Sequence, residues 1–178
     1  QGDPSPITWI KTFENTYSVR GHSVLQTGEG DYVIVGDKEY DMWLVKIDAY
    51  GNKIWDVTYS TGVMGMGAYG NSVQQTSDGG YIVVGYGYAE NEPGWESMEV
   101  LLVKFDSSGN MTWDTHFGDK YQDYGIFVKQ TSDGGYIVAG SSQTSSNLSY
   151  LLLIKTDLHG NMLWDKKFGG IVDDAGSS

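Results

Sequence analysis

The chain has 178 residues, of which 25 are glycine and only 3 are proline, a composition typical of a folded, turn-rich protein rather than a disordered one. Its formal net charge of −12 argues against nucleic-acid partners and anionic membranes, because their phosphates would repel it. Without cysteine it has neither disulfides nor thiolate metal sites, and no apolar run reaches the roughly 18 residues of a membrane span.

The first predicted strand spans residues 7–13 and matches the last strand of each later repeat, with Trp9 equivalent to Trp55, Trp113 and Trp164. The polar stretch before it does not begin with methionine. Together with the low isoelectric point and the many Ser, Thr, Tyr and Gly residues, this predicts a mature secreted protein, extracellular or at the cell surface. The alternative is a piece cut from a longer chain.

Three repeat units follow, each with four short runs of β-branched and aromatic residues separated by glycine turns. Tyrosines at equivalent positions give a period of about 50 residues, and four strands in such a period are typical of a propeller-type array. These tyrosines are Tyr32, Tyr81 and Tyr136. The units span about 21–59, 70–117 and 125–168.

The third unit shows the pattern of two hairpins most clearly. A polar Ser-Asp-Gly-Gly turn joins strands 127–131 and 136–140, and a second turn runs from Asp157 to Asn161. A lysine recurs two residues before this aspartate in every unit, and we expect it to contact the aspartate across the second hairpin. The lysines are Lys46, Lys104 and Lys155.

We therefore expect an all-β fold, a β-propeller-like array of four-stranded antiparallel sheets with three full repeats and an extra N-terminal strand, in one domain over residues 1–178. The first strand of each sheet should be innermost and the tryptophan strand outermost. A β-prism-like arrangement of three sheets is the alternative. The tryptophans of the fourth strands should lie between adjacent sheets and be equivalent in role.

The segments QTSDGGYIVAG and LLIKTDLHGNMLWDKKFGG resemble the repeats of bacterial and archaeal secreted β-propeller proteins. The resemblance extends from Ile7 over nearly the whole chain, and it implies the fold. It implies little about function, because such repeats occur in surface, adhesive and uncharacterised exported proteins. The first unit departs from the pattern at residues 28–31, where GEGD replaces SDGG.

No catalytic or metal-ligating set stands out, so we expect a non-enzymatic protein without a cofactor. The histidines His22, His116 and His159 fall at non-equivalent places in the repeats and do not form a ligand set by spacing. No GxSxG, HExxH or P-loop motif is present. The recurring aspartates are those of a scaffold, since a catalytic site would break the repeat.

The units differ most between their second and third strands, where function is expected. In the second unit this stretch carries Tyr86, Tyr88 and Trp95, which could stack on a sugar, clamp a partner or pack locally over the sheet. Asn110 and Asn147 each begin a glycosylation sequon. Asn110 also belongs to the repeated turn, which leaves Asn147 as the expected acceptor.

Three units leave an open arc with two bare sheet faces, larger than the apolar patches of a soluble monomer. We therefore expect a structural module whose partners are copies of itself, joined as a ring or filament by addition of the terminal strand to a neighbour's edge. The contact residues would be Ile7, Trp9, Ile10 and Phe13. The alternative is a carbohydrate- or protein-binding propeller of the adhesin or lectin type, and a hydrolase or lyase is less favoured.

Overall fold

The computed structural model describes residues 10–13, 18–62, 67–92, 95–119, 121–145 and 148–169, and for residues 90–92 and 95–96 it describes the backbone alone. This part of the chain consists of strands and turns, and none of its elements is a helix that could cross a membrane. The strands are β1 (Val19–Gln26), β2 (Tyr32–Lys38), β3 (Asp41–Ile47), β4 (Lys53–Tyr59), β5 (Ala68–Gln75), β6 (Tyr81–Glu92), β7 (Trp95–Phe105), β8 (Met111–Phe117), β9 (Asp123–Gln130), β10 (Tyr136–Gln143), β11 (Ser149–Thr156) and β12 (Met162–Phe168).

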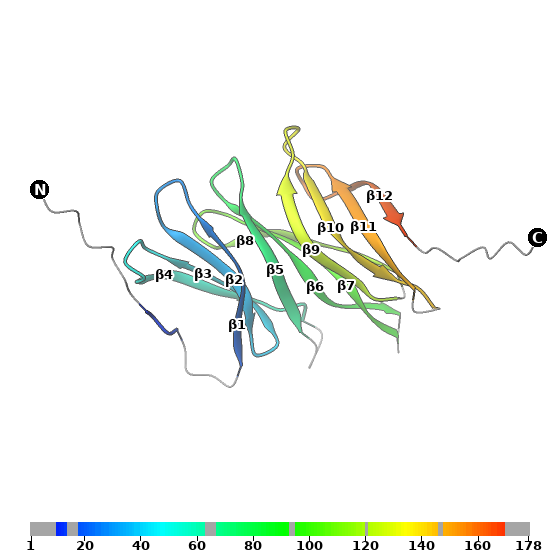
Figure 1. Cartoon of the computed structure of the whole chain (residues 1–178), viewed down its shortest axis with the longest axis horizontal. Helices are drawn as coiled ribbons and strands as arrows, with labels where there is room; N and C mark the ends of the chain where they lie inside the picture. The colour runs from blue at the N-terminus through cyan, green and yellow to red at the C-terminus, as the bar shows by residue number, and fades with distance from the viewer. Residues whose placement is uncertain are drawn as a thin grey trace, which may run out of the picture.

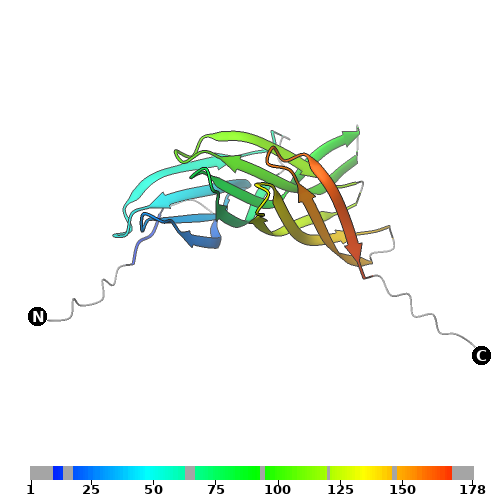
Figure 2. The ribbon, with the colours of Figure 1, turned by 90° about the horizontal axis from the view of Figure 1, so that it is seen from above.

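The strands form three antiparallel four-stranded sheets in simple meander order, β1–β4, β5–β8 and β9–β12. Figure 1 shows the sheets side by side in chain order, and Figure 2 shows from above that β5–β8 lies between the other two. The first strands β1, β5 and β9 are neighbours, whereas β4, β8 and β12 form the opposite edges of their sheets. Over the described residues the three sheets form an open row that does not close into a ring.

The expected all-β fold of repeated four-stranded sheets is confirmed, and the open row is compatible with either a propeller or a prism-like arrangement. Each sheet begins two residues before the unit boundary expected from the sequence, at Val19, Ala68 and Asp123. The expected N-terminal strand is not formed over its described part, because residues 10–13 have no strand conformation. Residues 7–9 lie outside the described part of the chain.

The middle sheet is apolar on both faces because it is packed between two others. On β7, Leu101 and Val103 face the first sheet in one core cluster, and Val100 and Leu102 face the third sheet in a second. All four side chains are fully buried. A strand with this double burial can form only where both neighbouring sheets are present, so β5–β8 anchors the other two.

The second hairpin of each unit is closed by a turn aspartate. In the third unit, Asp157 Oδ1 accepts hydrogen bonds from the backbone N–H groups of His159 (2.8 Å) and Asn161 (2.9 Å), and its Oδ2 accepts one from Asn161 Nδ2 (2.8 Å). Asp48 and Asp106 do the same in the other units. These carboxylates are therefore committed to turn geometry.

The recurring lysines do not contact these turn aspartates, so that expectation is wrong. Lys104 Nζ lies 2.9 Å from Asp78 Oδ2, and Lys155 Nζ lies 3.0 Å from Asp133 Oδ2, so each lysine pairs with the turn of the first hairpin. Lys104 lies opposite Ile82, one residue into β6, so its long side chain reaches across that strand to the preceding turn. Each ion pair thus links the two hairpins of one sheet.

Candidate functional site

Adjacent sheets interlock through the tryptophan of the fourth strand. The ring of Trp55 lies 5.9 Å from that of Tyr81 on the next sheet, and the rings of Trp113 and Tyr136 are also 5.9 Å apart. Each indole also covers the glycine of the next sheet's second turn. A Cβ added there would lie 3.0 Å from Trp55 at Gly109. The tryptophan thus needs a receiving sheet with a tyrosine and a glycine in register.

A second repeated contact accompanies the tryptophan. The N–H of Gly28 donates to Gln75 Oε1 of the next sheet at 3.4 Å, and the N–H of Ser77 donates to Gln130 Oε1 at 2.8 Å. In the third sheet the equivalent N–H is that of Ser132, and it has no acceptor among the described residues. The third sheet therefore has the donor N–H of this contact, but no glutamine of a following sheet accepts it among the described residues.

Trp164 has the same place on β12, but no sheet follows it in the described part of the chain. Its side chain is 41 % exposed, and Lys166 Nζ lies 5.7 Å above the ring. The register places Phe127, Leu151 and Phe168 on the same face, and they are 68 %, 53 % and 49 % exposed. We call this surface of β9–β12 the open face. The expected equivalence of the tryptophans therefore fails for Trp164.

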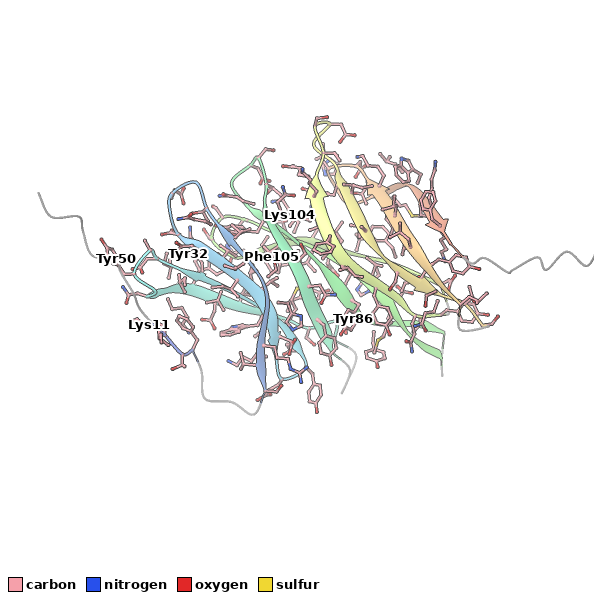
Figure 3. All side chains as sticks on the ribbon, viewed as in Figure 1. Lys11, Tyr32, Tyr50, Tyr86, Lys104 and Phe105 are labelled. Carbon is pink, nitrogen blue, oxygen red and sulfur yellow. The ribbon has the colours of Figure 1, made fainter. Side chains whose placement is uncertain are left out.

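The opposite end of the row is covered. Trp43, Val45 and Ile47 form a buried cluster on the outer face of β1–β4, and Phe13 packs against it. Lys11 lies near the turn of Asp48, whose pKa is lowered by the N–H and side-chain amide of Asn52, with a smaller contribution from Lys11. Figure 3 places Lys11 beside this turn.

The residues expected to mediate assembly are therefore divided. Phe13 packs on its own sheet, whereas Ile10 is 91 % exposed. Ile7 and Trp9 lie outside the described residues. The described part of this segment covers a face of its own chain and does not offer a strand edge.

Of the aromatic residues expected to bind a sugar or a partner, Tyr86 forms part of a tyrosine cluster with Tyr69 of β5 and Tyr124 of β9. Tyr86 stacks on Tyr69 with centroids 5.0 Å apart and meets Tyr124 edge-on at 4.9 Å. Burial is the main cause that raises the pKa of Tyr86, and Tyr69, Tyr124, Asp37 and Tyr88 add smaller electrostatic contributions in that order. The ring of Tyr86 is thus already engaged by the protein, and the side chain of Trp95 lies outside the described ones.

The two sequons also differ in what the structure describes. Asn110 donates from its backbone N–H and from Nδ2 to the two carboxylate oxygens of Asp106, each at 2.9 Å. A glycan on Nδ2 would compete with this turn bond. Asn147 lies outside the described residues.

The aspartates and histidines are distributed without a metal-binding group. Across the described ranges, no three His, Asp or Glu side chains lie close enough to hold a metal ion. His22 Nε2 lies 2.8 Å from Asp37 Oδ1, His159 is in a turn, and His116 borders a cavity between β8 and β12. Sequence reasoning missed this cavity, because it depends on how the second and third sheets meet.

Comparisons with known proteins add little to this geometry. No protein-family model matches the sequence, and no curated protein matches it either. One similar solved structure is the crystal structure of a protein of unknown function from Bacteroides caccae, with a TM-score of 0.43 and 9% sequence identity. The match covers 87% of this chain and 69% of the other. A likeness this weak carries no argument about function.

Proposed function

We propose that this chain is a non-enzymatic structural module of an extracellular assembly, in which copies join head to tail through the open face of β9–β12. The observation that carries the proposal is the exposure of Trp164. Its ring has the position at which Trp55 and Trp113 are each covered by a following sheet, yet it is 41 % exposed. A large exposed apolar face is typical of a docking surface. Because its tryptophan has the same position as Trp55 and Trp113, this face should bind a sheet that offers the same tyrosine and glycine.

The matching sheet is the β1–β4 sheet of a second copy. Its Tyr32 is equivalent to the tyrosines that receive Trp55 and Trp113, and its Gly51 has the positive φ of 79° of the receiving turns. Its Gln26 is equivalent to the glutamines that accept the interlocking hydrogen bond, so it would receive the N–H of Ser132.

Docking in this direction competes with the residues that precede β1. Phe13 packs on the same face of β1–β4 that a second copy would use. The N-terminal segment is therefore a cap that an incoming copy displaces, in contrast to the strand addition expected from the sequence. Because the two surfaces differ, the contact is heterologous and repeats into a ring or a filament.

The repeated carboxylates support a scaffold rather than a catalyst. Asp78 and Asp133 are held by lysines, and the turn aspartates are held by backbone N–H groups. Groups committed in this way are poor candidates for proton transfer to a substrate. The acidic composition and the abundance of Ser, Thr, Tyr and Gly support an extracellular location.

The test is the particle mass in solution, by light scattering, of the wild type and of two matched variants. Leu151→Glu places a charge on the open face, and Met111→Glu places the same charge at a similarly exposed site, 49 % against 53 %, on the middle sheet. We expect the wild type and Met111→Glu to associate and Leu151→Glu to be monomeric. A wild-type protein that stays monomeric at micromolar concentrations contradicts the proposal.

Deletion of residues 1–14 separates face docking from strand addition. If the segment caps β1–β4, the truncated chain associates more strongly than the full chain. If the segment supplies the intermolecular strand, the truncated chain is monomeric. The second result would retain self-assembly but overturn the direction of docking.

A further inference from the structure

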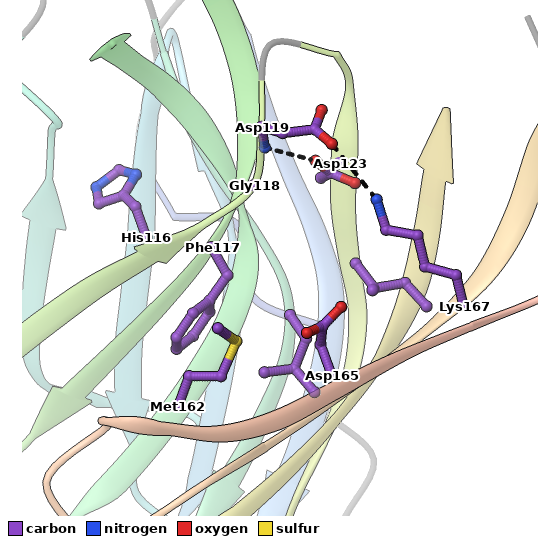
Figure 4. Close-up of a pocket in the computed structure, with 10 residues that line it drawn as sticks. His116, Phe117, Gly118, Asp119, Asp123, Met162, Asp165 and Lys167 are labelled. Atoms are coloured by element: carbon purple, nitrogen blue, oxygen red, sulfur yellow. Dashed lines mark hydrogen bonds and ion pairs between the residues drawn. The ribbon is translucent and has the colours of Figure 1, made fainter. Parts of the chain in front are cut away.

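A cavity of about 280 Å³ lies between the second and third sheets at the edge formed by β8 and β12. Its floor is apolar, with Phe117, Leu152 and Ile154, and its rim is polar (Figure 4). The polar lining residues are His116, Asp119, Asp123, Asp165 and Lys167. The volume is near the lower end of the range for small-molecule sites, about 300 Å³.

The repeat itself explains why the second and third sheets leave this space. Between the first two sheets, the hydroxyl of Tyr59 donates to Asp114 Oδ2 at 2.7 Å and closes the outer edge. The equivalents between the second and third sheets are Phe117, which has no hydroxyl, and Asp165. Asp165 therefore has no hydrogen-bond donor among the described residues and lines the cavity.

A buried carboxylate lines the cavity at the position where the middle sheet has an alanine. Asp123 is 1 % exposed, and its equivalent in the middle sheet is Ala68, which is 0 % exposed. Its Oδ2 accepts the N–H of Asp119 at 3.2 Å. Oδ1 is buried without a hydrogen bond of good geometry in the described part of the chain, and so is the hydroxyl of Ser142, which lies opposite Asp123 on β10 and opposes the rise in its pKa. Burial raises the pKa of this carboxyl group. An unsatisfied buried polar group is costly unless a ligand or water satisfies it.

The rim supplies both hydrogen-bond donors and acceptors. Lys167 Nζ lies 3.5 Å from Asp119 Oδ2, and this ion pair joins the third sheet to the second across the cavity mouth. His116 has its Nδ1 buried without a hydrogen-bond partner in the described residues, at 3.9 Å from Glu99 Oε2. Mixed donors and acceptors around an apolar floor match a ring with hydroxyl groups on its edge and C–H bonds on its face.

We propose that this cavity binds one saccharide unit, whose hydroxyl groups donate to Asp123 and Asp165 and accept from Lys167. The ring's apolar face would lie against Phe117 and Met162, which both line the cavity. Such a site is separate from the open face, because Asp165 and Lys167 point toward the second sheet whereas Trp164 and Phe168 point away from it. The inference therefore does not depend on self-assembly.

The experiment titrates glucose, galactose, mannose and N-acetylglucosamine into the full chain, with the methyl resonance of Met162 as the probe. We expect at least one of the four to shift this resonance saturably, with a dissociation constant of about 1 mM or lower. Phe117→Tyr restores the hydroxyl found between the first two sheets and should fill the site. Asp123→Ala restores the alanine of the middle sheet, and each variant should weaken binding at least about tenfold.

Both variants copy residues that the fold already accommodates, so their melting temperatures should remain close to that of the wild type. Leu151→Glu is the control, because it alters the open face and should leave the sugar affinity unchanged. The proposal is overturned if none of the four sugars shifts Met162, or if they bind Phe117→Tyr and Asp123→Ala as tightly as the wild type. Saturable binding of tetramethylammonium without binding of any sugar would also overturn it.

Discussion

The hydroxyl of Tyr59 donates a hydrogen bond of 2.7 Å to Asp114 Oδ2 and so ties the fourth strand of the first sheet to that of the second. Burial and the neighbouring carboxylate raise the pKa of Tyr59, so the hydroxyl stays protonated and can donate across the physiological range. The next pair of sheets lacks this bond because Phe117 replaces the tyrosine. The two interfaces thus differ at this position: the first has a hydrogen bond between its fourth strands, and the second has a cavity.

Tyr59→Phe should destabilise the chain by about 1 kcal/mol or slightly more, because it removes a hydrogen bond to a charged group. Urea unfolding followed by tryptophan fluorescence measures the change. Phe117→Tyr is the reciprocal variant and should be neutral or stabilising, because its hydroxyl can reach Asp165. Equal decreases in the free energy of unfolding of the two variants would contradict this account of the two interfaces.

Gly160→Ala should destabilise more than Gly79→Ala, although both glycines have a positive φ, 83° and 82°. At Gly79 an added Cβ meets nothing within 4 Å, so the cost is the left-handed backbone alone, about 1 kcal/mol. At Gly160 the Cβ would lie 2.7 Å from the ring of Trp113, which adds about 1–3 kcal/mol of overpacking. Indistinguishable unfolding midpoints would mean that the indole can move aside freely.

Trp113→Ala should cost about 3 kcal/mol, the lower end for a tryptophan in a core, because the ring packs on Tyr136 and the second core cluster. Trp164→Ala should cost much less in a monomer, because that ring is 41 % exposed. The comparison uses chemical denaturation in the Leu151→Glu background, which removes association from the measurement. If Trp164→Ala lowers the free energy of unfolding more than Trp113→Ala does, the open face must be covered by another part of the same chain.

Acid should weaken the chain through the ion pairs between its hairpins. Burial opposes ionisation of Asp78, but hydrogen bonds from Thr76, Lys104 and Gly80 prevail and hold its pKa at about 2, below the ordinary 3.8. A carboxylate with a lowered folded pKa contributes stability that is fully present above the unfolded pKa and is lost as the pH falls toward 2. The loss should therefore lie between about pH 4 and pH 2.

Asp78→Asn tests this window. The variant should be less stable than the wild type at pH 7, because Lys104, whose side chain is 6 % exposed, loses its charged partner. Between pH 4 and pH 2 its urea midpoint should fall less than that of the wild type. The remaining fall would come from groups such as Asp133, whose pKa of about 2 reflects hydrogen bonds from Thr131, Lys155 and Gly135. If the urea midpoint of the variant falls as much as that of the wild type between pH 4 and pH 2, the ion pair between Asp78 and Lys104 is not the cause of the acid sensitivity.

The sequence by itself determined the strands, their order and the turns, because these depend on local chemistry. Alternating apolar residues, the Ser-Asp-Gly-Gly turns and the Asp157 type of turn act within a few residues, and they recur in all three units. The predicted units 21–59, 70–117 and 125–168 therefore agree with the three sheets to within two residues at their starts.

Only the tertiary structure decided which of the repeated residues are equivalent in practice. Trp113 and Trp164 occupy the same place in the pattern, but one is covered by a following sheet and the other is exposed. Lys104 is two residues from Asp106 in sequence and yet pairs with Asp78, because side chains meet across strands rather than along them. Asp123 reads as one acidic residue among 23, and its burial beside a cavity arises because two sheets meet around it.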